Sequence, residues 1–316
     1  MFANLAEIDD RQFRALTGLS HAAFDKLLPT FTKNFRRAVQ ERYEQHRAQR
    51  QRKPGAGQKG KLETMEQKLF FSLYYFKTYP TFDVLGDRFG LDRSKACTNI
   101  HRLTPIVTAT LDQLGVLPKR KFDTAEELTA AFAKVEKLLI DATERPCCRP
   151  QDSAKQQAAY SGKKKHHTVK NTVVADTCRQ ILFLGYTVFG SQHDYARLKA
   201  EFPPEVDWFA HFKIWVDLGY LGFQKDYRTL ELHIPHKKPR KSEANPSPAL
   251  TDSQKEDNRQ MSRIRIAVEN AICKMKRFNI LVNKFRNRKD KFVDDVAAVA
   301  AGLANWMVAL TSGAST

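Results

Sequence analysis

The stretch KIWVDLGY, residues 213–220, decides the expected fold of this 316-residue chain. An apolar, β-branched run that stops at a carboxylate and a glycine predicts a buried strand, which delivers Asp217 to the carboxyl end of a sheet. Ligands bind outside that end of the strands in open α/β sheets. The stretch therefore predicts a functional site with Asp217 as its first residue.

Two further acids are candidates for the same site. A second apolar run, residues 135–140, is followed by Asp141, so two buried strands that end alike would set two carboxylates side by side. Glu269 lies mid-helix among basic and apolar residues. Hard divalent cations prefer carboxylate oxygens, and a pair of Mg²⁺ ions about 3.5–4 Å apart activates the nucleophile and stabilises the leaving oxygen in phosphodiester cleavage.

A structural role for the same three acids remains open. Strand-terminal aspartates often cap the turn that follows, and a mid-helix glutamate often pairs with an arginine four residues earlier. Here that arginine is Arg265, and Arg265 and Lys276 lie along the helical line of Glu269. If the acids bind metal, these two cations are candidates for holding the DNA backbone.

The composition favours a polyanionic partner. Lys and Arg number 53 against 35 Asp and Glu, which gives a formal net charge of +18 and a pI near 9.7. Neutralising phosphates releases counterions and drives binding, so nucleic acid is the first expectation. A merely soluble basic protein and one that binds anionic membranes are the alternatives.

Localisation signals and cysteine usage point to the cytoplasm. We see no signal-peptide pattern and no apolar run near the roughly 18 to 20 residues that span a bilayer, so a cytoplasmic protein without a membrane segment is expected. Five cysteines without CxxC pairs predict reduced packing residues rather than disulfides or a zinc site.

The first third of the chain reads as helical. Residues 1–46 predict accessory helices, and the basic, Gly- and Pro-rich residues 47–61 predict a loop. A capping box at residues 64–67 opens a helix, and helix, glycine turn and helix follow, which predicts a helix-turn-helix domain over residues 62–115. Its outward face carries Arg93, Ser94, Lys95, Thr98, Asn99 and Arg102. These side chains suit phosphates and base edges; an ordinary helical hairpin with a polar face is the alternative.

Other segments have simpler patterns. The basic run Lys163, Lys164 and Lys165 comes shortly after the first aspartate, where it would hold phosphates near a metal centre, although such a run is often only a solvated loop. Residues 170–175 and 181–189 predict a β-hairpin, and residues 237–248 predict a loop.

Several motifs together resemble one family. The segments IDATERP at 140–146, YSGKKK at 160–165, HD at 193–194, VDLGY at 216–220 and VENAI at 268–272, with KRF at 276–278, occur in this order. They resemble the DDE endonuclease domain of bacterial insertion-sequence transposases, a superfamily that includes the eukaryotic Harbinger transposases. YPTF at 79–82 and FGL at 89–91 resemble the helix-turn-helix of that family. The similarity covers roughly residues 10–310.

This resemblance implies a fold and a site. The fold would be an α/β, ribonuclease-H-like mixed sheet flanked by helices over residues 124–312, preceded by the all-α helix-turn-helix domain. Asp141, Asp217 and Glu269 would hold two Mg²⁺ ions, for which Mn²⁺ would substitute, and His193 and Asp194 would be auxiliary.

The resemblance also implies a function. The protein would be a transposase that binds the terminal inverted repeats of its element, cuts DNA and joins the freed end to a target. It would act as a homodimer or larger assembly on double-stranded DNA at the bacterial nucleoid. A related endonuclease without strand transfer and a catalytically inactive DNA-binding regulator are the alternatives.

Overall fold

The computed structural model describes residues 5–49, 60–243, 246–289 and 291–311. Most of the predicted loop at 47–61, namely residues 50–59, lies outside the described residues, as do residues 244 and 245 of the loop predicted at 237–248. The chain divides into two compact units. One contains Pro118–Lys274, and the other combines the chain up to Leu117 with the chain from Met275 onward.

The unit with both chain ends is built from helices. Its first helices and its last one belong to the same core, in which α2 and α11 pack on α5. The helices are α1 Asp10–Thr17, α2 His21–Gln45, α3 Met65–Thr78, α4 Phe82–Phe89, α5 Arg93–Gln113 and α11 Phe292–Thr311, with short 3-10 turns η1 Leu5–Glu7, η2 Arg47–Gln49 and η4 Asn279–Leu281.

The predicted helix-turn-helix elements form as α3, α4 and α5. Thr64 Oγ1 accepts the Gln67 amide at 3.2 Å, and the Gln67 side chain accepts the Thr64 amide at 3.3 Å, so the capping box is confirmed. Gly90 ends α4 with a φ of +65°, a left-handed conformation that glycine adopts without steric cost. Asp92 then caps α5 by accepting the Lys95 amide at 2.8 Å. Ala96, Ile100 and Leu103 of α5 are buried and face the core of the unit.

The last helix corrects one reading of the sequence. Helix α11 has the length and apolar composition of a membrane span, whereas the sequence reading found no apolar run near that length. Most of it is buried inside the protein, and it packs on α5 and α2. A core helix of a water-soluble fold has the same composition, and the burial shows that α11 serves as one here.

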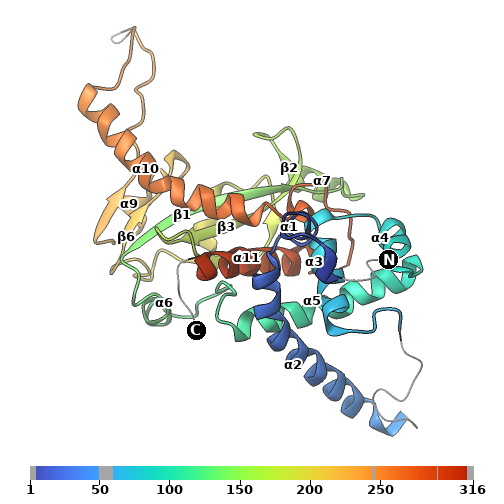
Figure 1. Cartoon of the computed structure of the whole chain (residues 1–316). Coiled ribbons are helices and arrows are strands. Elements are labelled where there is room, and N and C mark those ends of the chain that lie inside the picture. The colour runs from blue at the N-terminus through green and yellow to red at the C-terminus, as the bar shows by residue number, and fades with distance from the viewer. Residues whose placement is uncertain (1–4, 50–59, 244–245, 290, 312–316) are drawn as a thin grey trace. The chain divides into compact units, whose positions relative to one another are not determined.

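The unit from Pro118 to Lys274 contains a mixed sheet with strand order β2-β3-β1-β6-β7, and β4 and β5 also pair with β3. Strands β1 and β3 are antiparallel, whereas β1, β6 and β7 are parallel. The elements are α6 Ala125–Ala131, β1 Lys137–Pro146, α7 Ser153–Ala159, β2 Tyr160–Ser161, β3 His166–Ala175, β4 Ile181–Leu184, β5 Val188–Phe189, α8 Asp194–Glu201, β6 Lys213–Trp215, η3 Leu218–Tyr220, α9 Phe223–Asp226, β7 Glu231–His233 and α10 Asp252–Met275. Figure 1 shows β1 beside β3, with the long helix α10 crossing the view of both strands.

Strand β1 is longer than predicted. The sequence places Asp141 after the strand, but β1 continues to Pro146, because its antiparallel pairing with β3 extends as far as Pro146 opposite Thr168. Its parallel pairing with β6 stops at Leu139. Asp141 therefore lies in the middle of β1, just beyond the end of the parallel pairing.

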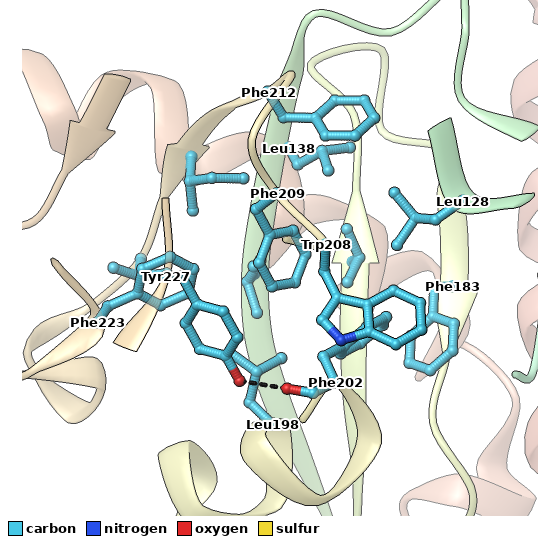
Figure 2. Packing of buried hydrophobic residues seen from close by; sticks show 14 of the residues in the cluster. Leu128, Leu138, Phe183, Leu198, Phe202, Trp208, Phe209, Phe212, Phe223 and Tyr227 are labelled. Atoms are coloured by element: carbon cyan, nitrogen blue, oxygen red, sulfur yellow. Dashed lines mark hydrogen bonds between the residues drawn. The ribbon is translucent and has the colours of Figure 1, made fainter. Parts of the chain in front are cut away.

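An aromatic core covers one face of the sheet. Phe202, Phe209, Phe223 and Tyr227 pack together beside the sheet residue Leu138 (Figure 2). The same buried cluster contains Ile140 of β1. The Tyr227 hydroxyl donates to the Phe202 carbonyl, so its polar end is satisfied inside the core. Burying each of these large rings contributes roughly 1.5–3 kcal/mol to folding stability. This packing holds in place the sheet that carries Asp141.

The cysteines do not form part of either core. All five are free; Cys148, Cys178 and Cys273 are exposed and the other two are half-buried. The expected role in packing is wrong for the three exposed cysteines.

Candidate catalytic and DNA-binding sites

The register of two parallel strands brings Asp141 and Asp217 together. Leu139 of β1 pairs with Trp215 of β6. Asp141 follows Leu139 two residues later on β1, and Asp217 follows Trp215 two residues later, in extended backbone just beyond the end of β6. Side chains two residues apart point to the same face of a strand, so both carboxylates leave the sheet on the face of Leu139 and Trp215. The sheet thus presents two neighbouring carboxylates from segments far apart in the sequence.

Backbone amides orient both carboxylates. Asp141 Oδ1 accepts the Ala142 amide at 2.7 Å, and Asp217 Oδ1 accepts the Gly219 amide at 2.7 Å as the cap of η3. A Cβ on Gly219 would lie 2.8 Å from Asp217 Oδ1, which is closer than real contacts allow. The glycine of the VDLGY stretch is therefore required for the position of the Asp217 carboxylate.

Asp141 is a largely buried carboxyl group without a direct ion pair among the described residues. Burial raises the pKa of Asp141 to about 6, and the neighbouring Asp217 adds to the rise, whereas the Ala142 amide and Arg265 oppose it. Neither aspartate has a salt-bridge partner among the described residues. A buried carboxylate beside a second one is unfavourable without a cation.

Glu269 occupies a different setting. It lies on α10, one helical turn after Arg265, with 4.0 Å between Arg265 Nη2 and Glu269 Oε1. Its side chain is 57% exposed, while that of Arg265 is 16% exposed. The predicted i−4 pair is thus present, and it is Arg265 whose charge reaches Asp141.

The donor set of the two aspartates fits a hard divalent cation. Their oxygens are the ligand type that Mg²⁺ and Mn²⁺ prefer, and the desolvated Asp141 would gain most from such an ion. Within the described ranges, no group of three or more His, Cys, Asp or Glu side chains is arranged to hold a metal ion. The role of Glu269 as a third ligand stays a prediction.

Beside the aspartates, β3 contributes a buried lysine that the sequence reading did not single out. Lys170 Nζ lies 2.7 Å from Asp194 and 3.4 Å from Glu144, with a side chain only 6% exposed. It also donates to the Gln192 carbonyl at 2.7 Å. His193 caps α8 by accepting the Tyr195 amide at 3.3 Å. The HD motif at 193–194 therefore starts α8 and joins it to the sheet through Lys170.

Tyr220 is a second residue that the sequence reading quoted without assigning it a role. It is 1% exposed, and its hydroxyl has no hydrogen-bond partner among the described residues. Burial raises its pKa, and the charges of Asp141, Asp194 and Asp217 raise it further. The hydroxyl thus lies close to the acids, and its place in the VDLGY stretch was the available signal.

The predicted DNA-contacting lysines lie on an exposed turn. Lys163, Lys164 and Lys165 connect β2 to β3 and all are exposed. Lys165 has a φ of +59°, and the turn is held by Ser161, whose carbonyl accepts the Lys165 amide at 2.8 Å. Lys276 comes directly after α10, is half-buried and belongs to the helical unit. Their contact with DNA stays a prediction.

The predicted DNA-contacting face of α5 is largely exposed to solvent. Arg93, Ser94, Lys95, Thr98 and Arg102 are exposed, and Asn99 is half-buried. Four of the six are partly engaged. Arg93 pairs with Asp83 at 3.9 Å and Lys95 pairs with Asp92 at 2.9 Å. The Asn99 side chain donates to the Lys95 carbonyl at 2.8 Å, and the Arg102 guanidinium lies 5.3 Å from the centre of the Phe35 ring.

Two known families match different parts of the chain. The family described as DDE superfamily endonuclease matches residues 140–305, a segment that contains Asp141, Asp217 and Glu269. The family described as helix-turn-helix of DDE superfamily endonuclease matches residues 60–113, which contain α3, α4 and α5.

A curated relative matches almost the whole chain. It is described as a probable transposase for insertion sequence element IS702 from Microchaete diplosiphon, and it is 28% identical over 305 residues, which cover 96% of this chain and 97% of that protein. No solved structure matches. The endonuclease match spans more than half of the chain, and the chain belongs to the DDE superfamily of endonucleases.

Proposed function

We propose that this protein is an insertion-sequence transposase, which binds the ends of its element and carries out metal-dependent hydrolysis and strand transfer on DNA. The observation that carries the proposal is the pair Asp141 and Asp217, placed side by side by the β1–β6 register. Support comes from the probable transposase to which the chain is similar over nearly its full length. The ribonuclease-H-like fold belongs to the same proposal, on the basis of the mixed sheet β3-β1-β6-β7.

Asp141 and Asp217, with Glu269 as the third acid, would hold two Mg²⁺ ions, or Mn²⁺ in their place. When bound, the metal supplies an activated oxygen nucleophile and charge stabilisation at the phosphodiester. The chain's own groups orient the ligands: the Ala142 and Gly219 amides each fix one oxygen of an aspartate. His193 and Asp194 are auxiliary in this scheme: His193 caps α8, and Asp194 pairs with Lys170.

Two reactions follow at one site. Hydrolysis at the element's end would break a phosphodiester bond and leave a 3′ hydroxyl. That hydroxyl would then attack a phosphodiester of the target, forming one bond and releasing one target strand end. Lys163, Lys164, Lys165, Arg265 and Lys276 are proposed to hold the DNA backbone.

The assembly is proposed to contain at least two copies. An element has two ends that must be cut and joined together, so we infer a homodimer or larger complex on DNA, acting at the bacterial nucleoid in the cytoplasm. The α5 face with Arg93, Ser94, Lys95, Thr98, Asn99 and Arg102 is proposed to bind the terminal inverted repeats.

The test uses duplex DNA that carries the gene's own flanking sequence, together with a target plasmid and Mg²⁺ or Mn²⁺. The proposal expects cutting at the element end and joining of the cut 3′ end to the plasmid, both lost in Asp141→Asn. Cutting without joining would favour the endonuclease alternative. Binding without cutting by the wild type in either metal would favour the DNA-binding regulator.

A further inference from the structure

A basic segment from the far end of the chain belongs to the same compact unit as the helix-turn-helix. Residues 284–289, with the sequence KFRNRK, lie within the endonuclease match, yet the contacts of the chain from Met275 onward group it with the N-terminal helices. Phe285 is buried and stacks on Tyr79 at the end of α3, with ring centres 6.2 Å apart. The segment is therefore a built part of the helical unit.

Arg286 anchors the segment to the start of the helix-turn-helix. Its guanidinium donates to the carbonyls of Tyr79 at 2.7 Å and Pro80 at 3.0 Å, and it lies 4.3 Å from the centre of the Tyr79 ring. Its backbone amide donates to the Tyr79 hydroxyl at 2.7 Å. These bonds hold the neighbouring residues in place relative to α4 and α5.

Asn287 connects the segment to α5 directly. Its side chain lies 3.3 Å from His101 Nε2 of α5. Burial lowers the pKa of His101, so at neutral pH the imidazole is uncharged. The next residue, Arg288, is exposed. It follows two residues that are bonded to the rest of the unit, Arg286 to the Tyr79 and Pro80 carbonyls and Asn287 to His101.

A pocket of about 590 Å³ opens between this segment and α5. Arg93, Ser94 and Thr98 line it from α5, and Arg286 and Arg288 line it from the segment. Asp83 is the one acid among its described lining residues; it lies 3.9 Å from Arg93, and both side chains are largely exposed. The lining is therefore rich in guanidinium and hydroxyl donors, the groups that bind phosphate oxygens.

We propose that this pocket seats a backbone phosphate of the DNA bound along α5, and that Arg288 is a DNA-contacting residue outside the helix-turn-helix. Arg286, whose Nη2 donates to the Tyr79 and Pro80 carbonyls, positions Arg288. The inference rests on the proposed binding of element-end DNA by α5. It extends the DNA-binding surface to a segment that follows the catalytic acids in the sequence.

The experiment measures binding of duplex DNA carrying the gene's flanking sequence by fluorescence anisotropy over a series of salt concentrations. The proteins are the wild type, Arg288→Ala, Arg288→Lys, Arg93→Ala and, as control, Arg11→Ala on α1, a likewise exposed arginine that does not line the pocket. Losing one phosphate contact lowers the slope of log affinity against log salt by about 0.9.

The expected result is a five- to tenfold loss of affinity in Arg288→Ala, with the slope reduced by about 0.9, while Arg288→Lys keeps the slope and Arg11→Ala behaves as the wild type. An Arg288→Ala variant with wild-type affinity, or with weaker binding but an unchanged slope, would overturn the inference. If Arg93→Ala loses binding and Arg288→Ala does not, the proposed function stands and the role of Arg288 as a DNA contact is wrong. If the wild type does not bind this duplex, both fail.

Discussion

Leu139 is the parallel partner of Trp215. This one pairing explains why Asp141 and Asp217, which are far apart in the sequence, lie next to each other. Shifting β6 against β1 by one residue would turn Asp217 to the opposite face of the sheet, because side chains alternate along a strand. The aromatic core on the far face fixes that register, since it buries Leu138 and Ile140 from β1 and Ile214 from β6. Packing on one face of the sheet thus holds the acids on the other.

Replacing Gly219 with alanine should reduce DNA cleavage without unfolding the protein. The added Cβ would lie 2.8 Å from Asp217 Oδ1, so the carboxylate must move, and misplacing a catalytic group by about 1 Å costs on the order of 100-fold in rate. We expect cleavage to fall at least about tenfold while the thermal unfolding midpoint changes little. Gly60→Ala is the control, since a Cβ there meets nothing within 4 Å. Equal activity of the two variants would contradict the proposed position of Asp217.

Glu269→Gln tests the third acid. If Glu269 is a metal ligand, cleavage should fall by more than about 100-fold, whereas a glutamate that only pairs with Arg265 would be dispensable. Glu256→Gln is a matched control on the same helix, where Glu256 pairs with Arg259 at 2.7 Å. Cleavage rates that are alike in the two variants would leave the site with two aspartates only.

Lys170→Met should destabilise the sheet unit strongly. The change would leave Glu144 and Asp194 without their buried partner, and breaking a buried ion pair from one side costs about 3–5 kcal/mol. Chemical denaturation measures this loss. Arg228→Ala is the control, because Arg228 and Asp207 form an exposed pair that contributes at most about 1 kcal/mol. A loss in Lys170→Met as small as in the control would disprove the structural role of Lys170.

The stability of the protein should depend on pH partly through Glu201. Burial raises the pKa of Glu201 above its ordinary 4.5, outweighing the hydrogen bond from Thr172 and the charge of Arg197. The folded state therefore holds the proton more tightly than the unfolded chain. The contribution of this carboxyl to stability is complete below 4.5 and is lost as the pH rises through the raised folded pKa.

Unfolding midpoints between about pH 4 and 7 test this dependence. Glu201→Gln should show a smaller fall with rising pH than the wild type. Glu136→Gln is a control of opposite sign, because the hydrogen bond from Lys213 lowers the pKa of Glu136, so its contribution is lost as the pH falls. Identical pH profiles for the wild type and Glu201→Gln would contradict the prediction.

Local signals predicted local structure well. The capping box at residues 64–67 and the hairpin of β3 and β4 are both present, because each depends on residues close together in the sequence. The strand before Asp217 was likewise readable from its apolar run.

Features that depend on distant pairing were not readable. Asp141 lies mid-strand because β3 pairs with β1 beyond it, and no pattern near Asp141 reports that partner. The grouping of the chain from Met275 onward with the N-terminal helices depends on packing between segments far apart in the sequence. The ion pairs of Lys170 join residues on three different elements, so no local pattern around Lys170 indicates them.

The most direct test of the account is metal-dependent cleavage of duplex carrying the gene's flanking DNA by Asp217→Asn, compared with Asp207→Asn. Asp207 is an exposed aspartate of the same unit, so the control matches the chemical change. The account predicts that the wild type and Asp207→Asn cut with Mg²⁺ or Mn²⁺, while Asp217→Asn binds the duplex equally well and does not cut. Cleavage by Asp217→Asn at the wild-type rate would contradict the assignment of the Asp141–Asp217 pair as the catalytic centre.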